Sequence, residues 1–393
     1  MRMRSLTSGA VLAIVMAAAA APSARAADPI FSQGVLHEFR IVMDPMDWVS
    51  LRANFRSNQY YAANISVDGE VLQQVGVRSR GKGSRDPNKP GLLIDTNRFV
   101  SNQEFHGLKK LVLDNVIQDS SFLHEPLAYQ VFEAMGIASP AISYTRLTVN
   151  DEFWGVYWLV ENIDKNFLAA RFGGDKEGNL FKYEYVENYT FTDKGSDPNS
   201  YLGLFQPETH EDKPDLTGLM QFIQAVNGAA DGAAAVAAAA PFIDVDKFLT
   251  YVAVENAIAG QDGWAGLEGM NNFYIYQFTG QTKFVVIPWD QDTSFVSGSW
   301  PVLQRLDTNV LTRKLLADPA KLAFYLAQLK AAAAMAVNPG FLNPKLEAYY
   351  AIMRNAVLAD TKKPWTNEQF EQGIQGMRGV IAARQPDILS QIP

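Results

Sequence analysis

Acidic and amide side chains flank a short predicted hairpin in the second half of the chain. The run "NNFYIYQFTGQTKFVVIPWDQD" has two apolar segments around a Thr-Gly turn; Asn271 and Asn272 open it, and Asp290 and Asp292 close it. Asp262 precedes it in the glycine-rich run "GQDGWAG". In an antiparallel hairpin the start of the first strand lies beside the end of the second, so we expect these side chains to gather at one edge. Hard oxygen ligands of this kind suit Mg²⁺, Mn²⁺ or Ca²⁺.

The order of these residues also matches the order in which protein kinases present the residues for phosphoryl transfer. Phosphoryl transfer uses one carboxylate near the acceptor hydroxyl, an amide ligand, and a second carboxylate that holds metal against the phosphates. Protein kinases present these parts in the order Asp, Asn, hairpin, Asp, and this chain has Asp262, Asn271 with Asn272, hairpin, and Asp290. The alternative is that Asp and Asn flank strands because they favour turns. Spacing alone leaves both interpretations open.

Two regions of different pattern surround these residues. Residues 27–186 show the apolar–polar alternation of strands, with one embedded helical stripe that ends at Gly136, whereas residues 216–393 are mainly helical. Between them, residues 187–215 are polar and rich in Asp, Pro and Gly, which predicts a surface insertion. We therefore expect an α+β fold with a strand-rich N-terminal lobe, a helical C-terminal lobe that carries the hairpin, and a site in the cleft between them.

The strand-rich region contains a cluster of basic residues. The run "VGVRSRGKGSRDPNKPGLLID" holds Arg78, Arg80, Lys82, Arg85 and Lys89 around a Gly-containing turn. The helix that follows supplies acidic residues that could orient one of these cations. The turn lacks a standard phosphate-loop pattern, and a solvated basic loop is the alternative.

Composition limits the class of protein. Arg2 and Arg4 precede a short apolar run that ends in Ala24-Arg25-Ala26, so residues 1–26 are predicted to be a secretory signal peptide. Its removal takes away three arginines and changes the formal charge from −8 to −11, which argues against a nucleic-acid partner. No later stretch is apolar enough to predict a membrane span. The chain has no cysteine and only four histidines, none at i, i+4 spacing, so a Cys- or His-based zinc site is not expected.

Several segments together resemble the CotH (spore coat protein H) kinase-like family. They are "VGVRSRGKGS", "FHGLKKLVLDN", "GVYWLVENIDKNFLAARFG" and "NNFYIY" with "KFVVIPWDQDTSF", in family order over about residues 70–300. The resemblance implies a divergent, atypical protein kinase fold that uses ATP and a divalent metal, Mg²⁺ or Mn²⁺, to phosphorylate secreted or coat proteins.

The resemblance also implies roles for the acidic and amide residues. Asp262 matches the catalytic aspartate, and Asp290 matches the metal-binding aspartate of the "PWD" segment. Asn272 matches the asparagine that opens "N-x-Y-x-Y", and Asn271 is a neighbouring candidate ligand. Asp292 is a candidate for a second metal or for supporting Asp290, with a turn role as the alternative.

For the nucleotide, the resemblance implies contacts from the strand-rich lobe. Lys89 is the expected phosphate lysine, with Arg78 and Arg80 beside it, and Glu125 is its expected partner on the helix.

The segment "WLVENID" stands where a kinase hinge would. Backbone groups near Glu161 and Asn162 are therefore expected to hold the adenine. The alternative for Glu161 is a solvated strand end.

These expectations describe a metal-dependent kinase that transfers the γ-phosphate of ATP to Ser or Thr of an exported protein or of itself. The protein would be secreted, periplasmic or at the cell surface, in an oligomeric state that sequence does not specify. Two alternatives stay open: a catalytically inactive CotH-like surface binding module, and a Ca²⁺-stabilised structural protein.

Overall fold

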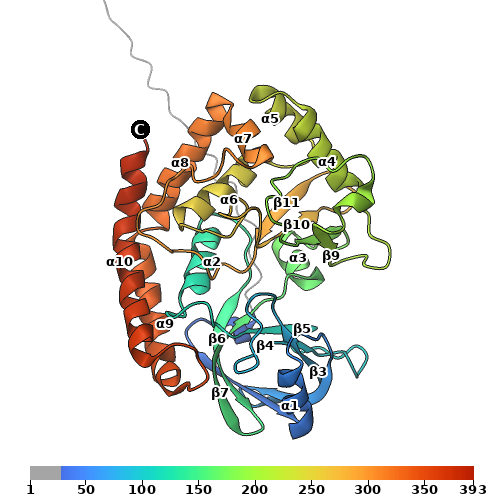
Figure 1. The fold of residues 1–393 in the computed structure, drawn as a ribbon, viewed down its shortest axis with the longest axis vertical. Helices are drawn as coiled ribbons and strands as arrows, with labels where there is room; N and C mark the ends of the chain where they lie inside the picture. Colours follow the sequence, from blue (N-terminus) through green and yellow to red (C-terminus); the bar gives the residue numbers. More distant parts are fainter. Residues whose placement is uncertain (1–27) are drawn as a thin grey trace, which may run out of the picture.

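The computed structural model describes residues 28–393, so the predicted signal peptide lies outside the described residues. The first lobe is a closed seven-stranded barrel in the order β1-β2-β3-β4-β5-β7-β6, closed by parallel pairing of β1 with β6 (Figure 1). Its strands are β1 (Leu36–Met43), β2 (Tyr61–Val67), β3 (Glu70–Arg80), β4 (Gly91–Asp95), β5 (Lys110–Asp114), β6 (Ile142–Val149) and β7 (Glu152–Val160). Closure leaves no unpaired strand edge in the barrel.

Alternation of side chains along the strands fills the barrel. In β1 every second residue is buried, so Phe39 and Ile41 point into the same core as Ile65 of β2 and Val77 of β3. The helix α1 (Pro45–Ala53) packs on this core, and Trp48 within it meets Trp154 edge to face. We had not predicted α1, although Asp44 as N-cap followed by proline is a helix-start signal.

The second lobe surrounds a four-stranded antiparallel sheet in the order β11-β10-β8-β9. Its strands are β8 (Asn179–Tyr183), β9 (Phe205–Pro207), β10 (Phe273–Gln277) and β11 (Phe284–Pro288). The helices of the chain beyond α1 are α2 (His124–Ala134), α3 (Lys165–Arg171), α4 (Thr217–Gly228), α5 (Ala233–Ala239), α6 (Val245–Ala257), α7 (Val310–Leu316), α8 (Pro319–Met335), α9 (Pro339–Ala359) and α10 (Asn367–Gln391), with short 3₁₀ turns η1 (Pro29–Phe31) and η2 (Pro198–Tyr201). The predicted two-lobed α+β fold is therefore confirmed.

Two predicted boundaries differ from the structure. β8 lies before residue 186, yet it pairs with β10, so the barrel lobe ends after β7 and not at residue 186. Residues 187–215 are not simply a surface insertion, because Tyr189, Phe191 and Tyr201 are buried in the core of the second lobe. The segment is polar on average, which predicted a surface position, but its aromatic side chains are buried and anchor it to the core.

The two C-terminal helices connect the lobes. α9 and α10 run along one side of the molecule, from the helical lobe down to the barrel (Figure 1). Just past the end of α9, Lys362 forms an ion pair of 2.7 Å with Glu152 of β7 and lies over the ring of Trp154. The lobes are thus joined both by the chain after β7 and by this C-terminal support.

Within residues 28–393, no single helix is long and apolar enough to cross a membrane; the bent pair α8 and α9 meets that criterion only when the two are taken together.

Candidate functional site

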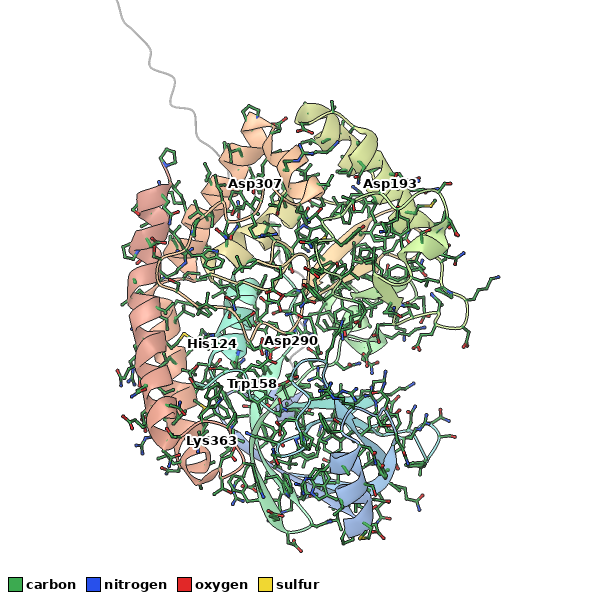
Figure 2. All side chains as sticks on the ribbon, viewed as in Figure 1. His124, Trp158, Asp193, Asp290, Asp307 and Lys363 are labelled. Atoms are coloured by element: carbon green, nitrogen blue, oxygen red, sulfur yellow. The ribbon has the colours of Figure 1, made fainter. Side chains whose placement is uncertain are left out.

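A cavity of about 760 Å³ lies between the two lobes. The barrel contributes the end of β3 and the basic loop after it, and the second lobe contributes the hairpin end, β8 and the loop around Asp262. Figure 2 shows Asp290 at the level where the helical lobe meets the barrel. Of the sequence-predicted residues, the cavity is lined by Arg78, Arg80, Asn162, Asp262, Asn271, Asn272, Asp290 and Asp292.

The hairpin brings its two ends together as predicted. Phe273 of β10 pairs with Pro288 of β11, and the Trp289 N–H donates to the carbonyl of Asn272 at 3.1 Å. Asn272 and Asp290, at the two ends, both have left-handed backbone conformations with φ of 55° and 53°. Asn and Asp tolerate this region better than most residues other than glycine. The side chains here are therefore mounted on a rigid, buried pair of strands.

Asp262 lies against the start of the hairpin. The amide of Asn271 donates to both of its carboxylate oxygens at 3.1 and 3.0 Å, and the amide of Asn272 donates at 3.0 Å. Burial raises the pKa of Asp262, and these hydrogen bonds only partly oppose the effect. The carboxylate is thus held at the cavity wall in an orientation set by two neighbouring amides.

The loop that carries Asp262 is held from below by Glu255, near the end of α6. The buried Glu255 carboxylate accepts hydrogen bonds from Trp264 N–H at 2.9 and 3.1 Å and from the Tyr251 hydroxyl at 2.7 Å. A side chain at Gly263 would come within 2.3 Å of this carboxylate, so glycine is required there. Burial raises the pKa of Glu255 to about 7. α6 begins at the Asp244 N-cap, so the helix fixes where this loop starts.

Asp290 and Asp292 are carboxylates without partners. Within residues 28–393, neither side chain forms a hydrogen bond or an ion pair. Burial, followed by the charge of Asp114, raises the pKa of Asp290 to about 6. Burial and the charge of Asp290 raise the pKa of Asp292 well above its usual value. Two half-buried acids so close in the chain favour a bound cation.

A chain of hydrogen bonds connects Asp290 to α2. The Asp290 N–H donates to the Tyr129 hydroxyl at 3.1 Å, and that hydroxyl donates to the Glu125 carboxylate at 2.5 Å. Burial and the charge of Asp290 raise the pKa of Glu125 well above its usual value. Glu125 therefore supports the hairpin end through Tyr129. The prediction that it partners Lys89 is wrong.

Arg80, at the end of β3, is the cation nearest to these acids. Its guanidinium forms an ion pair of 2.8 Å with Asp114 at the end of β5 and lies 5.8 Å from the ring centre of Trp289. Burial alone would lower the pKa of Arg80, but the charge of Asp114 and then that of Asp290 raise it. Arg80 stands opposite the hairpin acids across the cavity, where phosphates would need a positive charge.

The structure contradicts the placement of Lys89 beside the phosphates. Its ammonium is buried outside the cavity, where it forms an ion pair of 2.8 Å with Asp360 and donates to the Val156 carbonyl at 3.0 Å. Burial lowers the pKa of Lys89, although Asp360 opposes the effect. The lysine joins the barrel to the end of α9, a partner too distant in sequence for local pattern to reveal.

Only one of the two predicted hinge residues lines the cavity. Glu161 does not line the cavity: its N–H, which was expected to face the adenine, donates to the Ala141 carbonyl at 2.8 Å, and its carboxylate binds Arg171 at 2.8 Å. Asn162 lines the cavity together with the apolar side chains of Leu93 and Val112.

The donors at the hairpin end fit a hard divalent cation. Asp290 and Asp292 present free carboxylates, and the amide nitrogens of Asn271 and Asn272 point at Asp262, which leaves their oxygens available. In the described part of the chain, no three His, Cys, Asp or Glu side chains lie close enough to form a metal cluster by themselves. A nucleotide-bound Mg²⁺ commonly takes one or two carboxylates and completes its shell with phosphates and water.

Sequence reasoning missed three residues of this site. Asp114 pairs with Arg80, Tyr129 links Glu125 to Asp290, and Glu208 enters the cavity wall from just after β9. Asp114 carried a usable signal, because it ends an apolar strand in "LVLDN" just as Asp290 ends β11. Tyr129 carried a weaker one, being one helical turn from Glu125.

Comparisons with known proteins relate this chain to one family and to two other proteins. The family profile described as "CotH kinase protein" matches residues 77–386. Inner spore coat protein H of Bacillus subtilis (strain 168) is 23% identical over 372 residues, which cover 92% of this chain and 95% of that protein. The crystal structure of a Helicobacter pylori proinflammatory kinase, CtkA, aligns with a TM-score of 0.33 and 9% identity over 78% of this chain and 93% of that one. The chain belongs to the CotH kinase family.

Proposed function

We propose that this protein is a kinase that transfers the γ-phosphate of ATP to a Ser or Thr hydroxyl of an exported protein, or of itself. Membership of the CotH kinase family supports a kinase-like phosphotransferase. The observation that carries the proposal is the distribution of charge in the cavity: Arg80 lines its barrel side, and Asp290 and Asp292, which have no side-chain partner in the described part of the chain, line its hairpin side. In a bound metal–triphosphate complex, the phosphates would bind Arg80 and the metal would bind the hairpin acids.

The barrel side of the cavity is suited to the nucleotide. Arg80, held by Asp114, would bind phosphate oxygens and neutralise the charge that shifts toward the leaving diphosphate. Deeper in the cavity, Leu93 and Val112 offer apolar contacts to the adenine, and Asn162 offers an amide for its polar edge.

The hairpin side is suited to a divalent cation, Mg²⁺ or Mn²⁺. Asp290 and Asn272 would hold the cation, with Asn271 and Asp292 beside them. When bound, the cation supplies charge neutralisation for the phosphates and orients them.

Asp262 is placed for the acceptor. The acceptor oxygen forms a bond to the γ-phosphorus while the bond to the bridging oxygen of ADP breaks, and the hydroxyl proton passes to Asp262. The raised pKa of Asp262 makes its carboxylate a better proton acceptor than an ordinary aspartate. Asn271 and Asn272 hold that carboxylate in place before the acceptor arrives.

We further propose that the protein acts after export, because its N-terminus has the pattern of a signal peptide. The acceptor would then be a secreted, periplasmic or surface protein, with ATP supplied locally or used before export is complete.

The test is transfer of label from γ-labelled ATP by the mature chain, with Mg²⁺ or Mn²⁺, to itself or to casein. Asp262→Asn and Asp290→Asn remove the two key carboxylates with little change in shape, and each should lower the rate about 10³-fold. Asp212→Asn, on the exposed surface of the same lobe, is the matched control and should keep full activity.

The pattern of loss separates the proposal from its alternatives. Label that depends on both Asp262 and Asp290 supports the kinase. Metal-dependent thermal stabilisation by ATP without transfer would indicate a nucleotide-binding protein that has lost catalysis. Neither transfer nor stabilisation by ATP would overturn the proposal and favour a binding module.

A further inference from the structure

A row of arginines leads from the cavity across the outer face of β3. Arg80 and Arg78 are two residues apart on this strand and line the same cavity, and the next position on that face is Gly76. Arg98, from the segment after β4, lies across Gly76: a side-chain carbon added at Gly76 would be 2.7 Å from the Arg98 Cβ. The glycine thus lets a third arginine continue the row. We call Arg78 and Arg98 the outer arginines.

Aromatic and amide groups hold the outer arginines in place. The Tyr60 ring lies between them, 5.4 Å from the guanidinium carbon of Arg78 and 4.8 Å from that of Arg98. The Asn58 side-chain oxygen accepts from Arg78 at 3.0 Å and from Arg85 at 2.5 Å. These contacts position the cations without neutralising them.

The positive charge of this face is uncompensated. In the part of the chain that the structure describes, none of Arg56, Arg78, Arg85 and Arg98 forms an ion pair with a carboxylate. Burial, followed by repulsion from Arg78, lowers the pKa of Arg85. The chain has 42 acidic and 34 basic residues, so a cluster of cations free of acidic partners is unusual for its composition. Repulsion between neighbouring like charges destabilises the folded protein, and a bound anion would remove that repulsion.

We propose that the outer arginines bind an acidic stretch of the acceptor protein next to its phosphorylated Ser or Thr; this rests on the proposed kinase function. Alternate residues on a strand are about 6.6 Å apart, and an extended peptide has the same spacing. A peptide running along β3 with its hydroxyl in the cavity would therefore place carboxylates at alternate positions near Arg78 and Arg98. Arg98 does not line the cavity, so it is free to serve the peptide and not the nucleotide.

The position of the row favours a peptide over other anions. One end is continuous with the cavity, where the hydroxyl must react, and β3 lies at the outer part of the barrel lobe (Figure 1). Arg98 is exposed and does not line the cavity. The exposed loop residue Lys82 pairs with Glu184 of the second lobe at 3.4 Å, and both residues line the cavity.

The test measures peptide binding without ATP, by fluorescence anisotropy on the mature chain. The probe is a labelled twelve-residue peptide with one Ser followed by Glu at alternate positions, compared with peptides that carry Gln or Lys in place of Glu. We expect the Glu peptide to bind, and Arg98→Gln with Arg78→Gln to weaken its binding about 10-fold. Arg40→Gln with Arg146→Gln removes two arginines elsewhere on the barrel and should change binding less than two-fold. Melting temperatures of both double variants check that they fold.

Each outcome decides the proposal. Binding of the Glu peptide that depends on the outer arginines supports it. Equal binding of the Glu and Gln peptides, or equal binding by wild type and the Arg78/Arg98 double variant, overturns it. Tighter binding of a single-stranded oligonucleotide of the same charge, lost in that variant, overturns it in favour of a nucleic-acid surface. Because ATP is absent, a failure of the kinase function shows separately, as missing phosphate transfer in the earlier assay.

Discussion

Two of the places where the lobes meet treat charge in opposite ways. At the cavity, the side chains of Asp290 and Asp292 have no partner within residues 28–393, and on the barrel lobe Arg80 pairs with Asp114. At the junction of the barrel with α9, Lys89 and Asp360 form a buried pair.

The surroundings of the buried pair show how completely it is satisfied. Asp360 also accepts hydrogen bonds from the N–H groups of Val156, Lys362 and Lys363 at 3.1, 2.8 and 3.0 Å. Gly155, with φ of +113°, leaves room for this carboxylate, because a Cβ there would lie 2.2 Å from it.

The difference separates structural charges from functional ones. A buried ion pair that is also hydrogen-bonded to the backbone holds two parts of a chain together, whereas partly buried acids without a partner carry a desolvation cost that a bound ligand can remove. On this view, substitutions at the α9 junction should change stability, and substitutions in the cavity should change activity.

The largest expected effect is at the junction. Lys89→Met should lower the free energy of unfolding by about 3–5 kcal/mol, because it leaves the carboxylate of Asp360 buried without its cation. Urea unfolding monitored by tryptophan fluorescence measures this. Lys330→Met, at an exposed position of α8, is the matched control and should have little effect.

Catalysis provides the second half of that test. Below its melting range, Lys89→Met should retain phosphate transfer per folded molecule within about three-fold. A complete loss of activity in folded Lys89→Met would contradict the separation of roles and return Lys89 to the phosphate site.

The second effect is in the cavity and should appear in the rate. Arg80→Met should lower kcat/KM for ATP about 100-fold, since it removes the cation opposite the hairpin acids. Arg146→Met, whose partner Glu38 is exposed, is the control on the same barrel. If Arg80→Met lost stability but kept full kcat/KM, Arg80 would be a structural residue like Lys89, and the comparison would fail.

The smallest effect concerns the cost of the unpaired acids. Folding raises the pKa of Asp290 from 3.8 to about 6, so the native state prefers its protonated form. Stability should therefore fall as pH rises from about 4 to about 6, and it should stay lower above that range. Asp290→Asn, which cannot ionise, should be about 1–2 kcal/mol more stable than wild type at pH 7 without divalent metal, and no more stable at pH 4.

Thermal unfolding at the two pH values, in the presence of a chelator, measures this difference. Added Mg²⁺ with ATP should reverse the order at pH 7, because the ligand binds only the wild-type carboxylate. An Asp290→Asn variant less stable than wild type at pH 7 with chelator would mean that Asp290 has a structural partner in solution.

The sequence-based prediction succeeded where contacts are close along the chain. Asn272 and Asp290 come together because an antiparallel hairpin places its two ends side by side, and hairpin pairing is local. Asp262 joins them across only nine or ten residues. The alternation in β1 is likewise a local signal that the structure confirms.

The predictions failed where a partner far away in the sequence determines the contacts of a residue or the pairing of a strand. Lys89 had the residue type and the neighbourhood of a phosphate-binding lysine, but Asp360, 271 residues later, binds it instead. β8 was assigned to the barrel because it follows barrel strands in sequence, yet its pairing partner β10 lies about ninety residues away.

The sequence alone determined the strand and helix patterns, the acidic hairpin end and the family, because each depends on periodicity, turn residues or short runs of specific types. Only the tertiary structure decided which cation faces the acids. Arg80 and Lys89 are nine positions apart and equally charged, and their roles were separated by which carboxylate the closed barrel and α9 brought to each of them. Charge–charge attraction depends on distance in space, and that distance is set by long-range packing.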